Sequence, residues 1–331
     1  MPIHNSTYQH WDGTHLGIWR RRWVIAMNGL RGAFQGKWMR HIAVLCWGAS
    51  LIQIAFMFFL GQLLVKDSIV VRWVGTFNSA LQGGVSALTG WLETHPELSV
   101  ATAQNFLFYY FCKHLTVFSF LALALAIPHL ITRDLGSNAI IIYSAKAINR
   151  MDYLIGKFLA VFLLLCITWL GPAVTAWLLG NLLSPHWSFF WHSRAVLGNV
   201  LLFLVLAITV LSVVALGISA IAARDRTTVA VWTLWWVIGV PLVGISTMTR
   251  PWLKYLSLNF NLNQLALGIF RIDLDYTRAQ ENIGFLRESL RDMRRRAPEL
   301  LTAPEVTGSV IALVLILIVA VVVIQKKVRP E

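Results

Sequence analysis

The sequence has little charge, and what it has is unevenly spread. Of 331 residues only 13% are charged while 57% are apolar, and the charges lie in clusters between long uncharged stretches. This distribution is typical of membrane spans and excludes a soluble domain. The apolar stretches are continuous and lack the alternation of barrel strands, so we expect an all-α integral membrane fold.

Six stretches are long and apolar enough to cross a bilayer of roughly 30 Å as helices. They cover residues 42–64, 106–131, 154–182, 196–222, 227–248 and 308–325. None contains Asp or Glu, and the internal His114 and His129 lie near the ends of the second stretch, where they reach the head groups. Ion-coupled transporters and intramembrane enzymes need titratable groups at that depth. If this chain transports, its energy therefore comes from outside the chain.

A loop that binds nucleotide phosphates is also missing. Such a loop needs Gly, four residues, Gly-Lys and then Ser or Thr. The segment from Gly32 to Trp38 has the wrong spacing and ends on tryptophan, and Gly156-Lys157 is followed by Phe158. We expect no ATP hydrolysis, no catalytic residues and no cofactor in this chain.

The cysteines and the N-terminal histidines do not predict a metal site or a disulfide. Cys46, Cys112 and Cys166 all fall in apolar stretches and are expected to be reduced packing residues. The spacing of His4, His10 and His15 is irregular, with no carboxylate cluster nearby.

The net charge of +13 predicts an orientation in the membrane. Most Lys and Arg flank the apolar stretches, which argues against nucleic acid and for anionic lipid head groups as partners. The basic residues within 20–40 place the N-terminus in the cytoplasm, and six spans return the C-terminus there, where Lys326 and Lys327 agree. No cleavable signal peptide is visible in residues 1–40, so we expect the first span to stay as an anchor. Residues 1–40 are expected to be a cytoplasmic N-terminus and residues 41–326 a single six-span transmembrane domain.

Two regions do not fit this six-span topology easily. Residues 73–92 carry no charge, but their polar residues and helical spacing favour a helix on the outer surface over a seventh span. Residues 249–306 are outside in this scheme yet contain an arginine cluster at 291–296, which long loops tolerate. The sidedness and role of the insertion 272–306 stay open.

An amphipathic helix is predicted before the first span. Large apolar residues recur at steps of three and four, with basic residues away from that stripe. The stripe consists of Leu16, Trp19, Trp23, Met27, Leu30, Phe34 and Trp38. We interpret it as resting on the cytoplasmic leaflet, the alternative being a helix packed against the protein's own spans.

The connection after the second span carries the most specific pattern. Residues 131–158 mix apolar residues with spaced charges, and a short helix there could dock on a soluble partner. The pattern resembles the ABC type-2 permease family, in which an acidic residue precedes a short helix and a Ser, Arg, Tyr, Gly-Lys run opens the third span. The matching residues are Asp134, Tyr143, Ser144, Arg150, Tyr153, Gly156 and Lys157. The family's usual proline before the arginine is absent, and the insertion 272–306 is a further departure.

This resemblance implies a permease that dimerises with a second copy or a paralogue, each seated on a separate nucleotide-binding subunit that holds ATP and Mg. Segment 133–152, including Arg133 and Asp152, would contain the coupling helix, and Arg224, Asp225 and Arg226 form a second possible contact. The expected location is a bacterial cytoplasmic (inner) membrane. The alternatives are a membrane scaffold or sensor component, or a membrane-embedded enzyme; the substrate and the direction of transport stay open, with export favoured.

Overall fold

The computed structural model describes residues 17–63, 65, 68, 72, 76, 96–137, 149–221, 224–248, 250–274, 277 and 303–328. Every regular element in these ranges is helical. The elements are α1 (Ile18–Gln35), α2 (Lys37–Leu63), α5 (Pro96–Ala126), η1 (Ile127–His129), α6 (Thr132–Gly136), α8 (Arg150–Leu165), η2 (Cys166–Leu170), α9 (Gly171–Leu182), α10 (Ser188–Ser219), α11 (Asp225–Met248), η3 (Pro251–Leu256), α12 (Leu258–Phe270) and α15 (Val306–Lys327).

Six helical segments are long and apolar enough to cross a membrane, as the sequence predicts. They are Lys37–Gln62, Val100–Gly136, Arg150–Leu182, Ser188–Ser219, Asp225–Ser246 and Val306–Lys327. Each overlaps one predicted span and extends beyond it on at least one side, because polar and charged residues continue the helices past their apolar centres. The protein is thus a helical, multi-pass membrane protein in its architecture. Residues 73–92, apart from Thr76, and most of the insertion 272–306 lie outside the described ranges.

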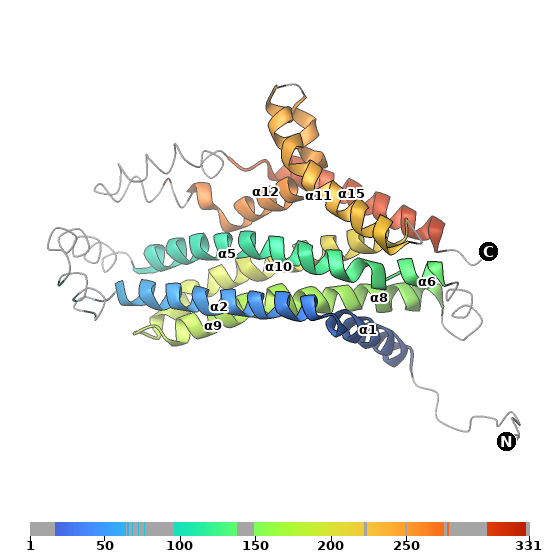
Figure 1. Ribbon diagram of the computed structural model, residues 1–331. Helices are drawn as coiled ribbons and strands as arrows, with labels where there is room; N and C mark the ends of the chain where they lie inside the picture. Colours follow the sequence, from blue (N-terminus) through green and yellow to red (C-terminus); the bar gives the residue numbers. More distant parts are fainter. Residues whose placement is uncertain are drawn as a thin grey trace, which may run out of the picture.

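The helices form a bundle with one projecting flank (Figure 1). Helices α2, α5, α8, α9 and α10 run side by side, and α12 and α15 pack along α10 while α11 leans outward. The centre of the bundle lies around α10, where Phe203 packs edge-on against Trp169 of η2 and also contacts Phe270 of α12. Helices α11 and α15 leave apolar side chains such as Val240 and Val319 exposed, as lipid-facing spans do.

The third span is interrupted halfway by η2, a π-helical turn followed by Pro172. A π-turn and a proline each free backbone carbonyls from the helical hydrogen-bond ladder. Side chains of α2 bind one such carbonyl and a neighbouring one: the Trp47 indole donates to the Ile167 carbonyl at 3.1 Å, and the Ser50 hydroxyl donates to the carbonyl of Pro172 itself at 2.9 Å. Helix α2 therefore stabilises the irregular point between α8 and α9.

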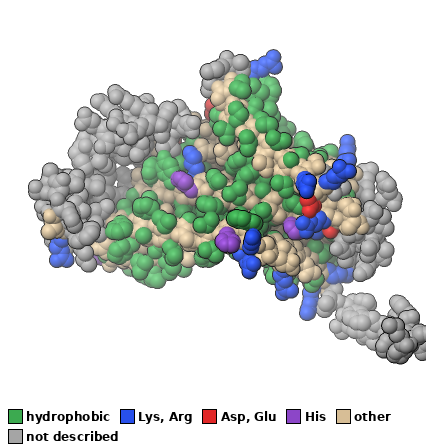
Figure 2. Space-filling model, viewed as in Figure 1, with side chains coloured by type: hydrophobic (Ala, Val, Ile, Leu, Met, Phe, Trp, Pro, Cys, Tyr) green, Lys and Arg blue, Asp and Glu red, His purple; other side chains and the backbone are tan. Residues whose placement is uncertain are grey.

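One end of the bundle gathers α1, α6, the first turns of α8 and α11, and the last turn of α15 (Figure 1). Lys and Arg side chains concentrate there, whereas apolar side chains dominate the middle of the molecule (Figure 2). We call this the basic end. Its assignment to the cytoplasm stays a prediction from the charge pattern.

Helix α1 is present, and the predicted stripe is divided between a buried and an exposed part. Leu30 of the stripe is buried together with Ala26, while Trp19 and Trp23 of the stripe are 73% and 52% exposed. A side chain at Gly29 would collide with Ala160 of α8, so the two backbones approach closely there. The alternative interpretation, packing against the spans, thus holds for one face of α1; contact with a membrane surface stays a prediction for the other.

Candidate functional site

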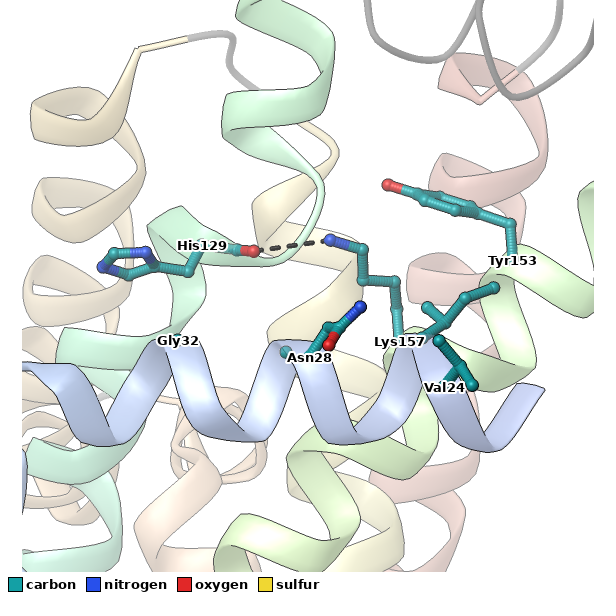
Figure 3. Close-up of a pocket in the computed structure, with 8 residues that line it drawn as sticks. Val24, Asn28, Gly32, His129, Tyr153 and Lys157 are labelled. Carbon is teal, nitrogen blue, oxygen red and sulfur yellow. Dashed lines mark hydrogen bonds between the residues drawn. The ribbon is translucent and has the colours of Figure 1, made fainter. Parts of the chain in front are cut away.

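Three residues of the permease-like motif meet in one charged cluster at the basic end. Asp134 on α6 accepts a hydrogen bond from the Tyr153 hydroxyl at 2.6 Å and an ion pair from the Lys157 ammonium at 2.8 Å. The ion pair is largely withdrawn from solvent, since the Lys157 and Asp134 side chains are 11% and 17% exposed. Lys157 also lies 3.4 Å from the His129 carbonyl (Figure 3). The cluster joins the two flanks of the connection 138–148.

A second ion pair fixes α1 to the same part of α8. The Arg22 guanidinium donates to the Asp152 carboxylate through two nitrogens, at 2.6 and 2.7 Å. The Asp152 side chain is 8% exposed and that of Arg22 19%, so water screens this pair poorly. Gly156, one turn along α8, leaves no room for a Cβ, which would lie 2.7 Å from Ile25. The motif glycine therefore permits the close approach of α1.

A more exposed pair links α6 to the start of α11. Arg133 donates to Asp225 at 3.0 Å and to Nδ1 of His129 at 2.8 Å. Because Arg is a donor only, His129 accepts at Nδ1 and carries its proton at Nε2 when neutral. Arg133 and Asp225 are 52% and 43% exposed, so this pair adds little to stability.

Arg150 connects α8 to the last span. Its guanidinium donates to the carbonyls of Ile324 and Gln325, at 3.2 and 2.6 Å, in the last turn of α15. A cation at the C-terminal end of a helix satisfies carbonyls that have no partner in the helix and interacts favourably with the helix dipole. The motif arginine therefore ties the connection to α15.

The remaining predicted residues are less involved. Arg224 and Arg226 are exposed on either side of Asp225. Tyr143 and Ser144 lie outside the described residues. The structure thus brings Arg133, Asp134, Arg150, Asp152, Tyr153, Gly156, Lys157 and Asp225 together at one end of the bundle.

Sequence reasoning missed Arg22, His129 and a buried hydroxyl group as parts of this end. Ser219, at the end of α10, accepts from the Ile131 and Thr132 amides at 2.8 and 3.1 Å and donates to the Ile127 carbonyl at 2.9 Å. These bonds hold the break between α5 and α6. The only sequence signal for Arg22 was an acidic residue of the segment 133–152, Asp152, with no assigned partner.

A cleft of about 360 Å³ lies beside the charged cluster, between α1, η1 and α8. From α1 it is lined by Val24, Ile25, Asn28, Gly29 and Gly32, and from the facing elements by His129, Tyr153 and Lys157. Figure 3 shows the Asn28 amide beside the Lys157 side chain, and the Lys157 ammonium directed to the His129 carbonyl.

The opposite end has a smaller polar clasp. Glu305, just before α15, accepts from Lys254 and from the Tyr255 hydroxyl of η3, each at 2.6 Å. Both hydrogen bonds favour the carboxylate and lower the pKa of Glu305, with Lys254 the larger cause. The hydrogen bond to Glu305 in turn raises the pKa of Tyr255.

The described residues contain no group of three or more His, Cys, Asp or Glu that could hold a metal ion. Three ion pairs between helices lie at the basic end: Arg22 with Asp152, Lys157 with Asp134, and Arg133 with Asp225. No protein-family model matches this chain, and a search of curated proteins gives no significant match. The resemblance to the type-2 permeases therefore rests on the motif residues.

Proposed function

We propose that this chain is the membrane-spanning permease subunit of an ATP-binding-cassette transporter, working as an exporter in a bacterial inner membrane. Two permease copies, or one copy and a paralogue, would enclose the pathway, and separate ATPase subunits bound at the basic end would supply the energy. ATP and Mg would bind to those subunits, since this chain has no phosphate-binding loop.

The observation that carries the proposal is the contact of Asp134 with Tyr153 and Lys157. These residues match the family motif from opposite flanks of the connection 138–148, and they meet through a hydrogen bond and an ion pair. A force applied to the connection by a soluble partner would pass to α6 and α8 together. Through Arg22 and Arg150 it would also reach α1 and α15.

Low charge within the spans supports the same proposal. The six predicted spans contain no Asp or Glu, so the chain offers no acidic group for ion coupling at mid-membrane depth. A transporter of this composition needs an external source of energy. A scaffold or sensor would need none, and this difference makes the proposal testable.

The test is a pull-down of the tagged full chain from its native membrane in mild detergent, followed by identification of copurified ATPase subunits. Asp134→Ala and Ser144→Arg are compared with wild type, and Arg250→Ala at the opposite end is the matched control. Ser144→Arg changes the connection and not the charged cluster, so it remains informative if Asp134→Ala fails to fold.

We expect an ATPase subunit with wild type and Arg250→Ala, and a reduced amount with Ser144→Arg. If monodisperse wild-type protein brings no nucleotide-binding protein, the permease proposal is wrong and a scaffold or sensor role is favoured. Equal copurification with Ser144→Arg and wild type would contradict docking at the connection.

A further inference from the structure

Two polar side chains of the cleft beside the charged cluster, one from α8 and one from α1, can donate to a phosphate. The Lys157 ammonium has three N–H donors, and the two partners within reach, Asp134 and the His129 carbonyl, leave one for a ligand. The Asn28 side chain, exposed on α1, adds an uncharged amide donor beside it (Figure 3). An oxyanion in the cleft could therefore accept from both residues.

The mouth of the cleft is electropositive. Arg21 and Arg31 share the stripe of α1 that carries Val24 and Asn28, because these four residues recur at steps of three and four. Residues 17–63, which include all of α1 and α2, contain no Asp or Glu. Among the described residues, the acidic groups beside the cleft, Asp134 and Asp152, are each bound to a cation. The α1 side therefore attracts anions.

Next to Asn28, the wall that α1 supplies is apolar and open. Val24 and Ile25 line it, and at Gly32 an added Cβ would meet no atom within 4 Å. A soluble anion gains nothing from such a wall, whereas the glycerol and first acyl carbons of a lipid would bury apolar surface against it. Trp19 and Trp23, exposed on α1, are residues that favour the membrane interface.

The depth of the cleft fits a lipid head group. The third candidate span begins at Arg150, so Tyr153 and Lys157 lie one and two turns inside it. Basic pockets between helices at this level bind phosphate-bearing lipid head groups. We propose that the cleft between α1, η1 and α8 binds the head group of an anionic phospholipid, with Lys157 and Asn28 contacting the phosphate.

The test uses the full chain, purified in mild detergent and delipidated. Phosphatidylglycerol, phosphatidylcholine, or phosphatidylglycerol together with millimolar inorganic phosphate is added, and bound lipid is counted by native mass spectrometry. Gly32→Leu fills the cleft from a position with open space, and Arg31→Gln removes one cation from its mouth. Gly198→Leu is the matched control, since Gly198 is an exposed glycine of α10 that also has no atom within 4 Å of an added Cβ.

We expect wild type and Gly198→Leu to retain one phosphatidylglycerol in preference to phosphatidylcholine. Gly32→Leu should weaken retention about tenfold, as expected for a blocked site, and Arg31→Gln about fivefold, as expected for one cation near the lipid surface. Thermal unfolding of each variant without lipid provides the folding control. Because no ATPase subunit takes part, this result is independent of the pull-down.

Three outcomes would overturn the inference. Equal retention of phosphatidylglycerol and phosphatidylcholine by wild type would show that charge is not recognised. Unchanged retention by Gly32→Leu would place the bound lipid elsewhere. Loss of bound phosphatidylglycerol in the presence of millimolar inorganic phosphate would identify a soluble anion as the occupant.

Discussion

The ion pair between Asp134 and Lys157 allows a quantitative test of the charged cluster. At 2.8 Å the gross Coulomb attraction is about 6 kcal/mol for an effective dielectric constant near 20. Desolvation of two mostly buried side chains opposes this attraction. Close charge pairs in partly buried settings show net coupling energies of about 1.5–7 kcal/mol. We expect a coupling of about 2–3 kcal/mol for this pair.

The measurement is a double-mutant cycle with Asp134→Asn and Lys157→Met. Asparagine retains an acceptor for the Tyr153 hydroxyl, so the cycle isolates the charge interaction. The free energy of unfolding of wild type, both single variants and the double variant is measured in detergent micelles. Asp134→Asn alone should destabilise by about 2–4 kcal/mol, because Lys157 then remains buried without a counter-charge.

Arg226→Gln is the matched control for loss of one charge at the basic end. Arg226 is exposed, and its substitution should change stability by less than about 0.5 kcal/mol. A coupling below about 0.5 kcal/mol between Asp134 and Lys157 would refute the argument that this pair joins α6 to α8.

Three further predictions concern other contacts. Asp152→Asn should leave Arg22 without a counter-charge and lower the free energy of unfolding by about 1–3 kcal/mol, with faster proteolysis within α1; unchanged cleavage would contradict the anchoring of α1. Ser50→Ala should lower the free energy of unfolding by about 1 kcal/mol, because the Pro172 carbonyl loses its side-chain donor. A thermal midpoint equal to that of wild type would argue against this role of Ser50. The lowered pKa of Glu305 stabilises the folded protein at pH values above the ordinary carboxyl pKa, and this stabilisation is lost as the pH falls through the lowered pKa. The raised pKa of Tyr255 stabilises the folded protein below the ordinary phenol pKa, and this stabilisation is lost as the pH rises through the raised pKa. Thermal midpoints of wild type should thus fall more steeply than those of Glu305→Gln below about pH 4.5, and parallel curves would contradict the clasp.

Hydropathy was sufficient to predict the six spans, because helices in lipid must satisfy their backbone internally and therefore need long apolar stretches. The motif also identified the residues of the charged cluster. It could not show that Asp134 contacts Lys157, since that contact depends on how α6 and α8 pack. The partner of Asp152 was missed for the same reason: Arg22 is 130 residues away.

The sequence predicted the helix α1 but not the contact that holds it on α8, and the reason is physical. Periodicity weights large apolar residues, and so it selected Trp19 and Trp23. Helices within a membrane protein approach most closely where side chains are small. Gly29 and Gly156 provide that approach, and neither contributes to a hydrophobic stripe. The π-turn of the third span could not be predicted either, because Pro172 was its only signal in the sequence.

The small-residue contact has a consequence for the proposed transport cycle. Helix α1 meets α8 at Gly29 and Gly156 and is held by the ion pair to Asp152, so α1 and α8 should move as one unit. The π-turn then separates α8 from α9, whose Gly180 packs closely on Met57 of α2. A force received at the basic end would therefore tilt α1 with α8 and would be absorbed at the π-turn, where α2 supplies the hydrogen bonds, before it reached the far half of the bundle.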